Sequence, residues 1–353
     1  MSDLSSSIEI DGRKIGPGEP PYIIAELSAN HGGSLTRALA IIEGAAAAGV
    51  DAVKFQAYTP ESMTIATDKP GFVIEGDNPW KGRQLYDLYA EAATPYDWFP
   101  DLYAHARKLG ITPFTTPFGA DAIPMLEELD NPVYKIASFE AVDAELIKAC
   151  TRTGKPLLIS TGMCSKEDIG RSLDAVRAQG GDQVAIFRCN SGYPANLDEA
   201  NLLAMPDMAE SFAVPVGYSD HTIGHAAAIA ACALGANMIE KHVIDTIDPP
   251  TPDSSFSMLL DDFGDFVGLC HQAYRARGQV LYGPFENERG SLSFRRSLYA
   301  VTDIAAGAEI RPQDIRSVRP GFGLHPRHLD EIIGRKTAVA VERGDPITWD
   351  IFG

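Results

Sequence analysis

The stretch VPVGYSDHTIGHAAAIAACALGANMIEKHVID, residues 214–245, decides the fold. Its first part, VPVGYSD (214–220), is short and apolar, and NMIEKHVID (237–245) has the same character. Between them, HAAAIAACALGA (225–236) has apolar residues at helical spacing. Two nearly continuous apolar strands joined by a helix are typical of a parallel sheet that is covered by helices.

The same unit recurs toward the N-terminus. Ala- and Leu-rich stretches at helical spacing, such as LTRALAIIEGAAAAG (35–49), alternate with further short strand-like runs. These runs are PYIIAEL (21–27), DAVKFQAY (51–58), ITPFTTPF (111–118), VYKIASFE (133–140), PLLISTGM (156–163) and VAIFRCNSGYP (184–194). Eight strand–helix units in a row favour a closed (β/α)8 TIM barrel over an open Rossmann sheet.

The two ends of the chain differ from this repeat. IEIDGRKIG (8–16) predicts a hairpin with a turn at Asp11-Gly12, which we expect to plug the bottom of the barrel. After about residue 283 the sequence becomes polar and rich in turns, and short segments separated by Gly- and Asp-containing turns follow. We therefore predict a barrel domain with an N-terminal hairpin over 1–282, a linker over 283–296 and a compact module poor in long helices over 297–353.

The connection that follows the second strand is unusually long. It runs from about residue 59 to 96 and carries Trp80, Tyr86 and Tyr89. Because it leaves the carboxyl end of a barrel strand, it lies on the face where such barrels carry their active sites. We expect it to be a substrate-covering loop.

The charge balance excludes some partners. Lys and Arg number 30 against 48 Asp and Glu, a formal net charge of −18 in 353 residues. Such an excess of negative charge repels nucleic acid and anionic membranes. An anionic substrate would therefore need a local basic pocket.

The cysteines and the N-terminus predict a cytoplasmic protein. None of the five cysteines forms a C-x-x-C pair, so we expect reduced, mostly packed thiols. MSDLSSSIEIDG has no apolar signal region, and no apolar run is long enough to span a bilayer. We expect no interaction with a membrane.

Hydrogen-bonding side chains end nearly every predicted strand. A barrel brings the carboxyl ends of its strands to one face, where its chemistry is located. The residues are Glu26, Lys54, Gln56, Thr115, Thr116, Lys135, Ser138, Glu140, Ser160, Thr161, Asn190, Ser191, Ser219, Asp220, His221, Glu240 and His242.

His221 and His242 end adjacent strands, the seventh and the eighth. Two imidazoles that converge there can bind one divalent ion and leave open positions for substrate oxygens. The alternative is a pair of histidines that are satisfied by hydrogen bonds. Their place at the strand ends of a barrel favours the metal.

Lys54 and Lys135 lie within otherwise apolar strand sequence, KFQ and YKIAS. A buried lysine needs a partner, and a phosphate or carboxylate would serve. Two alternatives stay open: solvated surface lysines, and a Schiff-base lysine as in class I aldolases.

The remaining polar residues carry less specific signals. Ser138, Ser160, Thr161, Gly162 and Ser219 offer hydroxyls and loop amides that suit a phosphate. Ser165 and Asp143 are expected only to cap helices. Glu26 and Glu140 could orient sugar hydroxyls or transfer protons, or could form salt bridges with a neighbouring lysine.

Taken together, the motifs resemble the sialic acid synthase family over essentially the whole chain. AELSANHGG (25–33), VKFQAY (53–58), YKIAS (134–138) with Glu140, ISTGM (159–163), YSDHTIG (218–224) and IEKH (239–242) occur in the family's order. SLYAVTDI (297–304) and SVRPGFG (317–323) resemble its antifreeze-like (SAF) domain. WKGRQLYDLYAEAATPYDW (80–98) and SVRPGFGLHP (317–326) are similar to the branch that makes pseudaminic acid.

The resemblance implies a metal-dependent condensation of phosphoenolpyruvate with an acetamido sugar. The branch implies 2,4-diacetamido-2,4,6-trideoxy-altrose as the sugar and pseudaminic acid as the product. N-acetylneuraminate and legionaminate synthase are the alternatives within the family. Ser191 stands where the sialic branch often has Asn, and Asn78 is not carried over as a site residue because its loop does not align with that branch.

The resemblance also implies roles for residues. Catalytic roles fall on Glu140, Lys54 and Glu26, with Glu140 as the base for water. The phosphate and carboxylate of phosphoenolpyruvate are expected on Lys54, Thr116, Lys135, Ser138, Ser160 and Ser219. The sugar is expected near Glu26, Gln56, Tyr193 and Asp253, and Ser191 is expected to bind substrate. A divalent Mn, Mg or Co ion is expected on His221 and His242.

The family is also expected to act as a homodimer with swapped C-terminal domains. Arg319, in the RPG triplet, resembles the residue that the lid domain of one subunit inserts into its partner's active site. Phe322 and Leu324 lie close to it in the sequence and would suit methyl and acetyl groups, or would simply pack the small module. From the residues alone, a Schiff-base aldolase and a non-catalytic sugar-binding protein remain open as other classes.

Overall fold

The computed structural model describes residues 4–76 and 80–353. By its internal contacts the chain divides into two compact units, Met1–Gly278 and Gln279–Gly353. Each unit is described by itself. The division predicted at residue 282 and the linker predicted over 283–296 stay predictions.

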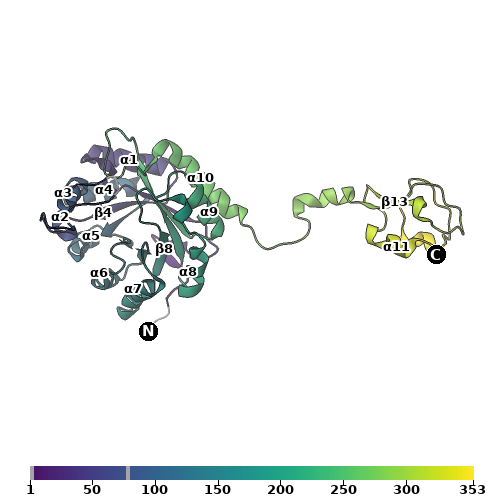
Figure 1. Cartoon of the computed structure of the whole chain (residues 1–353), viewed down its shortest axis with the longest axis horizontal. Coiled ribbons are helices and arrows are strands. Elements are labelled where there is room, and N and C mark those ends of the chain that lie inside the picture. The colour runs from purple at the N-terminus through teal and green to yellow at the C-terminus, as the bar shows by residue number, and fades with distance from the viewer. Residues whose placement is uncertain (1–3, 77–79) are drawn as a thin grey trace. The chain divides into compact units, whose positions relative to one another are not determined.

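The first unit is a closed barrel of parallel strands, as predicted (Figure 1). Each strand pairs with the next along the chain, and β9 pairs with β10, which in turn pairs with β3 and so closes the barrel. The strands are β3 (Tyr22–Glu26), β4 (Ala52–Ala57), β5 (Thr112–Pro117), β6 (Tyr134–Ile136), β7 (Leu157–Ser160), β8 (Val184–Cys189), β9 (Val216–Asp220) and β10 (Met238–Ile244). A short strand, β11 (Met258–Leu259), adds to β10.

Helices follow the strands and surround the barrel in Figure 1. They pack their apolar faces against the outward side chains of the strands to form the largest core. The helices are α1 (Leu35–Ala47), α4 (Phe99–Lys108), α5 (Ile123–Glu128), α6 (Ala144–Thr151), α7 (Lys166–Ala178), α8 (Ala204–Phe212), α9 (Ala226–Leu234) and α10 (Leu260–Ala276). Ser165 and Asp143 cap α7 and α6 as predicted, because their side chains accept backbone N–H groups of the first turn.

Side chains that point into the barrel change from apolar to polar along each strand. The apolar ones form a separate cluster that fills the interior at the amino ends of the strands. Ile8, Ile10 and Ile15 of the N-terminal hairpin, β1 (Ile8–Ile10) and β2 (Arg13–Ile15), belong to that cluster. The hairpin therefore plugs the barrel as predicted. Gly217 leaves room for the Phe187 ring, since a Cβ at 217 would lie 2.6 Å from it.

The long connection after β4 has structure of its own. It contains α2 (Pro60–Met63) and α3 (Leu85–Ala92). Between them, Ile74 and Arg83 lie on a short paired arm, where the Ile74 amide donates to the Arg83 carbonyl at 2.9 Å and the Leu85 amide donates to the Phe72 carbonyl at 2.9 Å. The connection is thus a folded segment attached to the carboxyl end of β4.

The second unit has a small core of its own and only short elements, as predicted. β12 (Ser297–Ala300) pairs antiparallel with β13 (Ile315–Val318), and α11 (Leu329–Ile332) is the α-helix of the unit. Leu298, Ile315 and Ile347 are among its buried residues. Within the unit, a run of 3-10 turns over Glu286–Phe294 precedes β12.

Two further observations concern the cysteines and the length of the apolar helices. All five cysteines are free, and four of them are buried, as predicted. Among the described residues, no helix is long and apolar enough to cross a membrane.

Candidate active site

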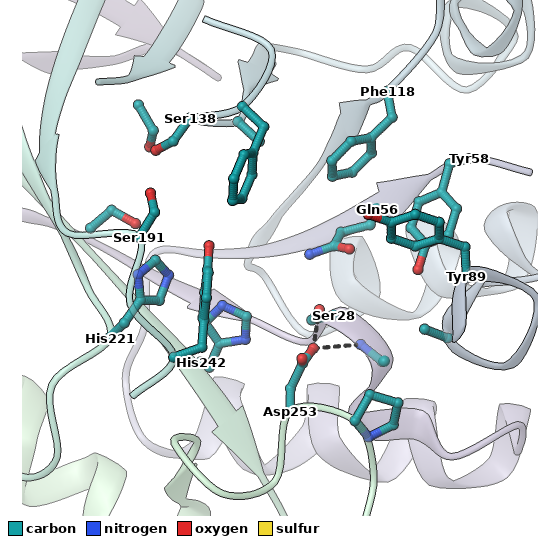
Figure 2. A pocket seen from close by; sticks show the side chains of 18 of the residues that line it. Ser28, Gln56, Tyr58, Tyr89, Phe118, Ser138, Ser191, His221, His242 and Asp253 are labelled. Atoms are coloured by element: carbon teal, nitrogen blue, oxygen red, sulfur yellow. Dashed lines mark hydrogen bonds between the residues drawn. The ribbon is translucent and has the colours of Figure 1, made fainter. Parts of the chain in front are cut away.

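A cavity of about 880 Å³ opens at the carboxyl ends of the barrel strands (Figure 2). Polar residues from several strands line it together with aromatic residues from the connections. Of the residues predicted for the site, those that line the cavity are Lys54, Gln56, Lys135, Ser138, Ser160, Ser191, Tyr193, Ser219, His221, His242 and Asp253.

Strand register brings these residues to one level. Glu26 lies opposite Lys54 on one side and opposite His242 on the other, and Glu240 lies opposite Ser219. Because side chains alternate between the two faces of a strand, Glu240 and His242 point to the same side. Lys241, between them, points outward and pairs with Asp220 at 2.7 Å.

Glu26, Lys54, Lys135 and Glu240 form a buried group of alternating charges, which we call the charged cluster. Lys54 Nζ lies 2.8 Å from Glu26 Oε2 and 3.1 Å from Glu240 Oε1. Lys135 Nζ lies 3.1 Å from Glu240 Oε2. Both lysines are buried, so they are not solvated surface lysines, and the salt bridge considered for Glu26 is formed.

The cluster sets the charges of its members. Burial alone would lower the pKa of Lys54, but the carboxylates of Glu240 and Glu26 outweigh it and raise that pKa. Burial would raise the pKa of Glu240, but the two lysines together lower it to about 2. Glu26 pairs with Lys54 alone, and this single lysine does not offset the cost of burial, so the pKa of Glu26 is raised. Burial also lowers the pKa of Lys135, since Glu240 offsets only part of the cost.

Lys135 and Ser160 have capacity to bind more than the structure shows. Lys135 pairs with the Glu240 carboxylate, and an ammonium has three donors in all. The Ser160 hydroxyl is buried and has no hydrogen-bond partner among the described residues. Ser138 accepts the Gly162 amide at 3.1 Å, and a side chain at 162 would collide with the Ser138 and Ser191 hydroxyls. The loop after β7 therefore approaches β6 closely, and glycine makes this possible.

His221 and His242 lie beside each other with ring centroids 5.3 Å apart. His221 Nδ1 donates to the Asn190 carbonyl at 2.8 Å, which leaves the lone pair on Nε2. His242 Nδ1 is buried without a hydrogen-bond partner among the described residues. Burial, and then the charge of His221, lowers the pKa of His242 well below its usual value, so it is neutral. The pair is thus not fully satisfied by hydrogen bonds, and neutral imidazole is the form that binds metals.

These two histidines fit a divalent ion with open positions. Among the described residues, no group of three or more His, Cys, Asp or Glu side chains is arranged to hold a metal. The imidazoles would be the protein ligands, and water or substrate oxygens would complete the coordination.

Glu140 lies outside the charged cluster. One of its carboxylate oxygens is buried and has no hydrogen-bond partner among the described residues. Burial is the main cause that raises the pKa of Glu140 to about 7. A carboxyl with this pKa can exchange a proton near neutral pH.

Gln56, Tyr193 and Asp253 surround the space next to the histidines. Gln56 donates to Glu26 at 2.8 Å, and the Tyr193 ring centroid lies 4.5 Å from that of His221. Asp253 accepts the Ser28 hydroxyl and the Ala29 amide, as the dashed lines in Figure 2 show. Burial raises its pKa.

Some predicted residues are not part of the cavity lining. Glu26 and Thr116 lie behind Lys54, whose ammonium contacts both, and Glu140 lies outside the lining residues. Arg319 is an exposed residue of the second unit. Asn78 lies outside the described residues.

The two apolar residues near Arg319 differ from each other. Leu324 packs against the core of the second unit, so for this residue the packing interpretation holds. Phe322 is 66% exposed.

Sequence reasoning missed several cavity residues. Glu240 was noted at its strand end but not assigned a role, although its alternation with His242 could have revealed it. Cys189 lies on the cavity with its thiol 3.8 Å from His221 Nδ1, and His221 lowers its pKa to about 7 against the opposing effect of burial. Ser28, Tyr58 and Phe118 also line the cavity. Ser28 and Tyr58 lie within the motifs AELSANHGG and VKFQAY, and Phe118 ends the run ITPFTTPF, but none of the three is assigned a role from the sequence.

The fold and the site together define a (β/α)8-barrel protein with buried lysines and a histidine pair in the cavity above its strands. The NeuB family model matches residues 41–282 and the SAF domain model matches residues 295–352. The chain belongs to the NeuB family.

The chain is similar to named proteins of this kind over most of its length. It is 39% identical to pseudaminic acid synthase of Campylobacter jejuni over 94% of this chain and 96% of that protein. Pseudaminic acid synthase of Helicobacter pylori is also 39% identical, over 94% of this chain and 98% of that protein. Among solved structures, N-acetylneuraminic acid (sialic acid) synthetase of Leptospira borgpetersenii superposes with a TM-score of 0.73 at 28% identity, covering 84% of this chain and 98% of that one.

Proposed function

We propose that this chain condenses phosphoenolpyruvate with 2,4-diacetamido-2,4,6-trideoxy-altrose and water to give pseudaminic acid and phosphate. The observation that carries the choice of sugar is the 39% identity to pseudaminic acid synthases over nearly the full length of both chains. The cavity supports the chemistry, because it combines buried ammonium donors with a histidine pair.

Phosphoenolpyruvate would bind beside the charged cluster. Its phosphate and carboxylate need donors, and Lys54, Lys135 and the unpartnered Ser160 hydroxyl supply them. Ser138 and Ser219 line the same part of the cavity, and Thr116 contacts Lys54 from behind. Glu240 holds both lysines in place, so the anion would meet an arrangement that is already formed.

His221 and His242 would hold a divalent ion such as Mn, Mg or Co. When bound, the ion supplies a Lewis acid that polarises the aldehyde of the sugar. The protein's own part is to present two imidazoles at the ends of adjacent strands, His242 in its neutral form and His221 fixed by the Asn190 carbonyl.

The reaction forms one C–C bond and one C–O bond to water, and it breaks the C–O bond to phosphate. Carbon 3 of phosphoenolpyruvate attacks the aldehyde carbon, whose oxygen takes up a proton. Water then adds to carbon 2 and loses a proton, for which Glu140 is the proposed base. The bond from carbon 2 to the phosphate oxygen breaks, and phosphate leaves.

The proposed function is tested by competition between two sugars. With saturating phosphoenolpyruvate and metal, we expect kcat/KM for the diacetamido trideoxy sugar to exceed that for N-acetylmannosamine by about 100-fold, since unpaired polar groups are strongly disfavoured. Phosphate release is the readout. A higher kcat/KM for N-acetylmannosamine would reject the sugar assignment. Absence of phosphate release would favour a binding protein, and covalent trapping by borohydride would favour a Schiff-base aldolase.

We further propose a homodimer in which the second unit of one subunit covers the cavity of its partner. Exposed apolar side chains follow the carboxyl ends of the barrel strands, among them Phe139, Met163 and Ile223. Phe322 of the second unit is also exposed, three residues after Arg319. Because the carboxyl ends of the strands share one face of the barrel, Phe139, Met163 and Ile223 belong to the same face, and apolar side chains gathered on one face favour an interaction surface.

Mixed dimers test this arrangement. Arg319→Ala and His221→Ala chains should each be inactive alone. A heterodimer of the two has one composite site with both changes and one with neither, so we expect phosphate release to return. Verified heterodimers without rescue would mean that the second unit acts on its own chain.

A further inference from the structure

One side of the cavity is apolar, and no predicted site residue lies there except Gln56 at its edge. Met63, Ile74, Leu85, Leu88 and Phe118 line it together with the rings of Tyr58 and Tyr89. We call these seven residues the apolar wall. Figure 2 shows Tyr58, Tyr89 and Phe118 grouped on one side, away from Ser138, Ser191 and His221.

Ring contacts and backbone hydrogen bonds fix the positions of the wall residues. The Tyr58 ring contacts the Phe118 ring edge-on at 5.2 Å between centroids and the Tyr89 ring at 5.9 Å. Ile74 and Leu85 lie on the two sides of the paired arm in the long connection, which is joined by backbone hydrogen bonds. Trp80, between them in sequence, donates its indole N–H to the Pro252 carbonyl at 3.0 Å, next to Asp253.

The wall is also uncharged. Burial raises the pKa of Tyr58 and of Tyr89, so both phenols keep their protons. In Figure 2, Ser138, Ser191 and His221 lie on the other side of the cavity, and Gln56, Ser28 and Asp253 lie between that side and the two tyrosines. Met63, Ile74, Leu85, Leu88 and Phe118 have no side-chain hydrogen-bonding group, so a substrate hydroxyl placed against them would be left unpaired, which costs free energy.

The proposed function fixes which end of the sugar lies where. The aldehyde must lie near the histidines and near carbon 3 of phosphoenolpyruvate. The other end of the open-chain sugar, carbon 6, is then directed away from the charged cluster. In the proposed acceptor this carbon is a methyl group, whereas in N-acetylmannosamine it carries a hydroxyl.

We propose that the apolar wall, chiefly Ile74 and Leu85 with Phe118, binds the methyl end of a 6-deoxy acceptor sugar and discriminates against the 6-hydroxy form. This inference rests on the proposed function. It places sugar selectivity in the barrel's long connection, in addition to any contribution from Phe322. A methyl group in an apolar pocket contributes roughly 10- to 200-fold in selectivity.

The test compares two acceptors that differ only at carbon 6, the 6-deoxy sugar and its 6-hydroxy analogue. Ile74→Asn and Leu85→Asn add an amide to the wall. Ile65→Asn is the matched control, because Ile65 lies in the same connection but is 67% exposed and does not line the cavity. For each protein, kcat/KM is measured with both sugars, and Kd is measured calorimetrically with the corresponding alditols, which lack the aldehyde and cannot react.

The wild-type chain and Ile65→Asn should prefer the 6-deoxy form in both measurements. In Ile74→Asn and Leu85→Asn the preference should fall by about tenfold, while KM for phosphoenolpyruvate stays unchanged. If both wall variants keep the wild-type preference and the wild-type Tm, the inference is wrong.

The alditol measurement separates this inference from the proposed function. If the wild-type chain releases no phosphate with either sugar, the condensation is rejected. The ratio of the Kd values for the two alditols then still shows whether the apolar wall prefers the 6-deoxy form. A preference that both wall variants lose supports it, and equal affinities in the wild type overturn it.

Discussion

Chelated protein is expected to release no phosphate from phosphoenolpyruvate and sugar, and Mn, Mg or Co should restore turnover. His242→Ala and His242→Gln should lose at least about 1,000-fold in kcat, because several kcal/mol of charge stabilisation at the aldehyde would be absent. The expectation comes from the buried His242 nitrogen that has no partner among the described residues and from the neighbouring imidazole of His221.

The control for this prediction is His105→Ala. His105 pairs with Glu43 on the helical surface, 3.0 Å away, and does not line the cavity. It should keep full activity. Thermal melts of both His242 variants establish that they fold, and the Gln side chain fills most of the space of the imidazole. Full turnover by exhaustively chelated protein would exclude the metal role.

Glu140→Gln is expected to lower kcat by about 100- to 10,000-fold, the usual contribution of a general base. In the wild-type chain the rate should fall as the pH drops below about 7, where Glu140 takes up a proton. The residual rate of the variant should lack this acid limb. The measurement is the pH profile of kcat with saturating metal and both substrates.

The raised pKa of Glu140 also predicts the direction in which Glu140→Gln changes the stability of the folded chain. The pKa of Glu140 is raised in the folded chain to about 7, from 4.5 when unperturbed. Between these values the folded chain keeps the proton that the unfolded chain loses, so stability falls as the pH rises and stays low above 7. Gln imitates the protonated form, and Glu140→Gln should therefore be at least as stable as the wild type at pH 8.

Glu145→Gln is the matched control for Glu140→Gln. Glu145 is exposed on α6 and pairs with Lys148 at 2.8 Å, so its loss should leave both the rate and the acid limb unchanged. An acid limb that persists in Glu140→Gln would assign it to another group and remove Glu140 from the role of base.

Strand periodicity explains why much of the site was predictable. Lys54 and Lys135 stand out because each interrupts an apolar strand, and the closed barrel brings both to one level. The polar ends of the strands follow from the same alternation. Periodicity does not identify ion-pair partners. Only the three-dimensional structure shows that Glu240 pairs with both lysines.

The apolar wall was not predictable in the same way. Ile74 lies in a part of the connection without strand or helix periodicity, and its position depends on backbone hydrogen bonds across the paired arm. Leu85, Leu88 and Tyr89 recur at helical spacing in α3, but this spacing does not tell which part of the fold they face. The sequence predicts that the connection covers a substrate, because it is long, leaves the active face and carries Trp80, Tyr86 and Tyr89. Of these three residues, Trp80 and Tyr89 line the cavity. Tyr86 does not, because its hydroxyl bonds to Glu61 outside the cavity.

The folded connection between β4 and α4 has an evolutionary consequence. Glu26, Lys54, Lys135, Glu240 and His242 lie on the barrel strands, and His221 directly follows β9, so the strand register joins them into one frame. Six of the seven wall residues come from Tyr58 and the segment that follows it, up to Tyr89. Descendants of such a barrel could therefore acquire a new acceptor by exchanging one stretch of chain, while the inherited machinery for phosphoenolpyruvate stayed untouched.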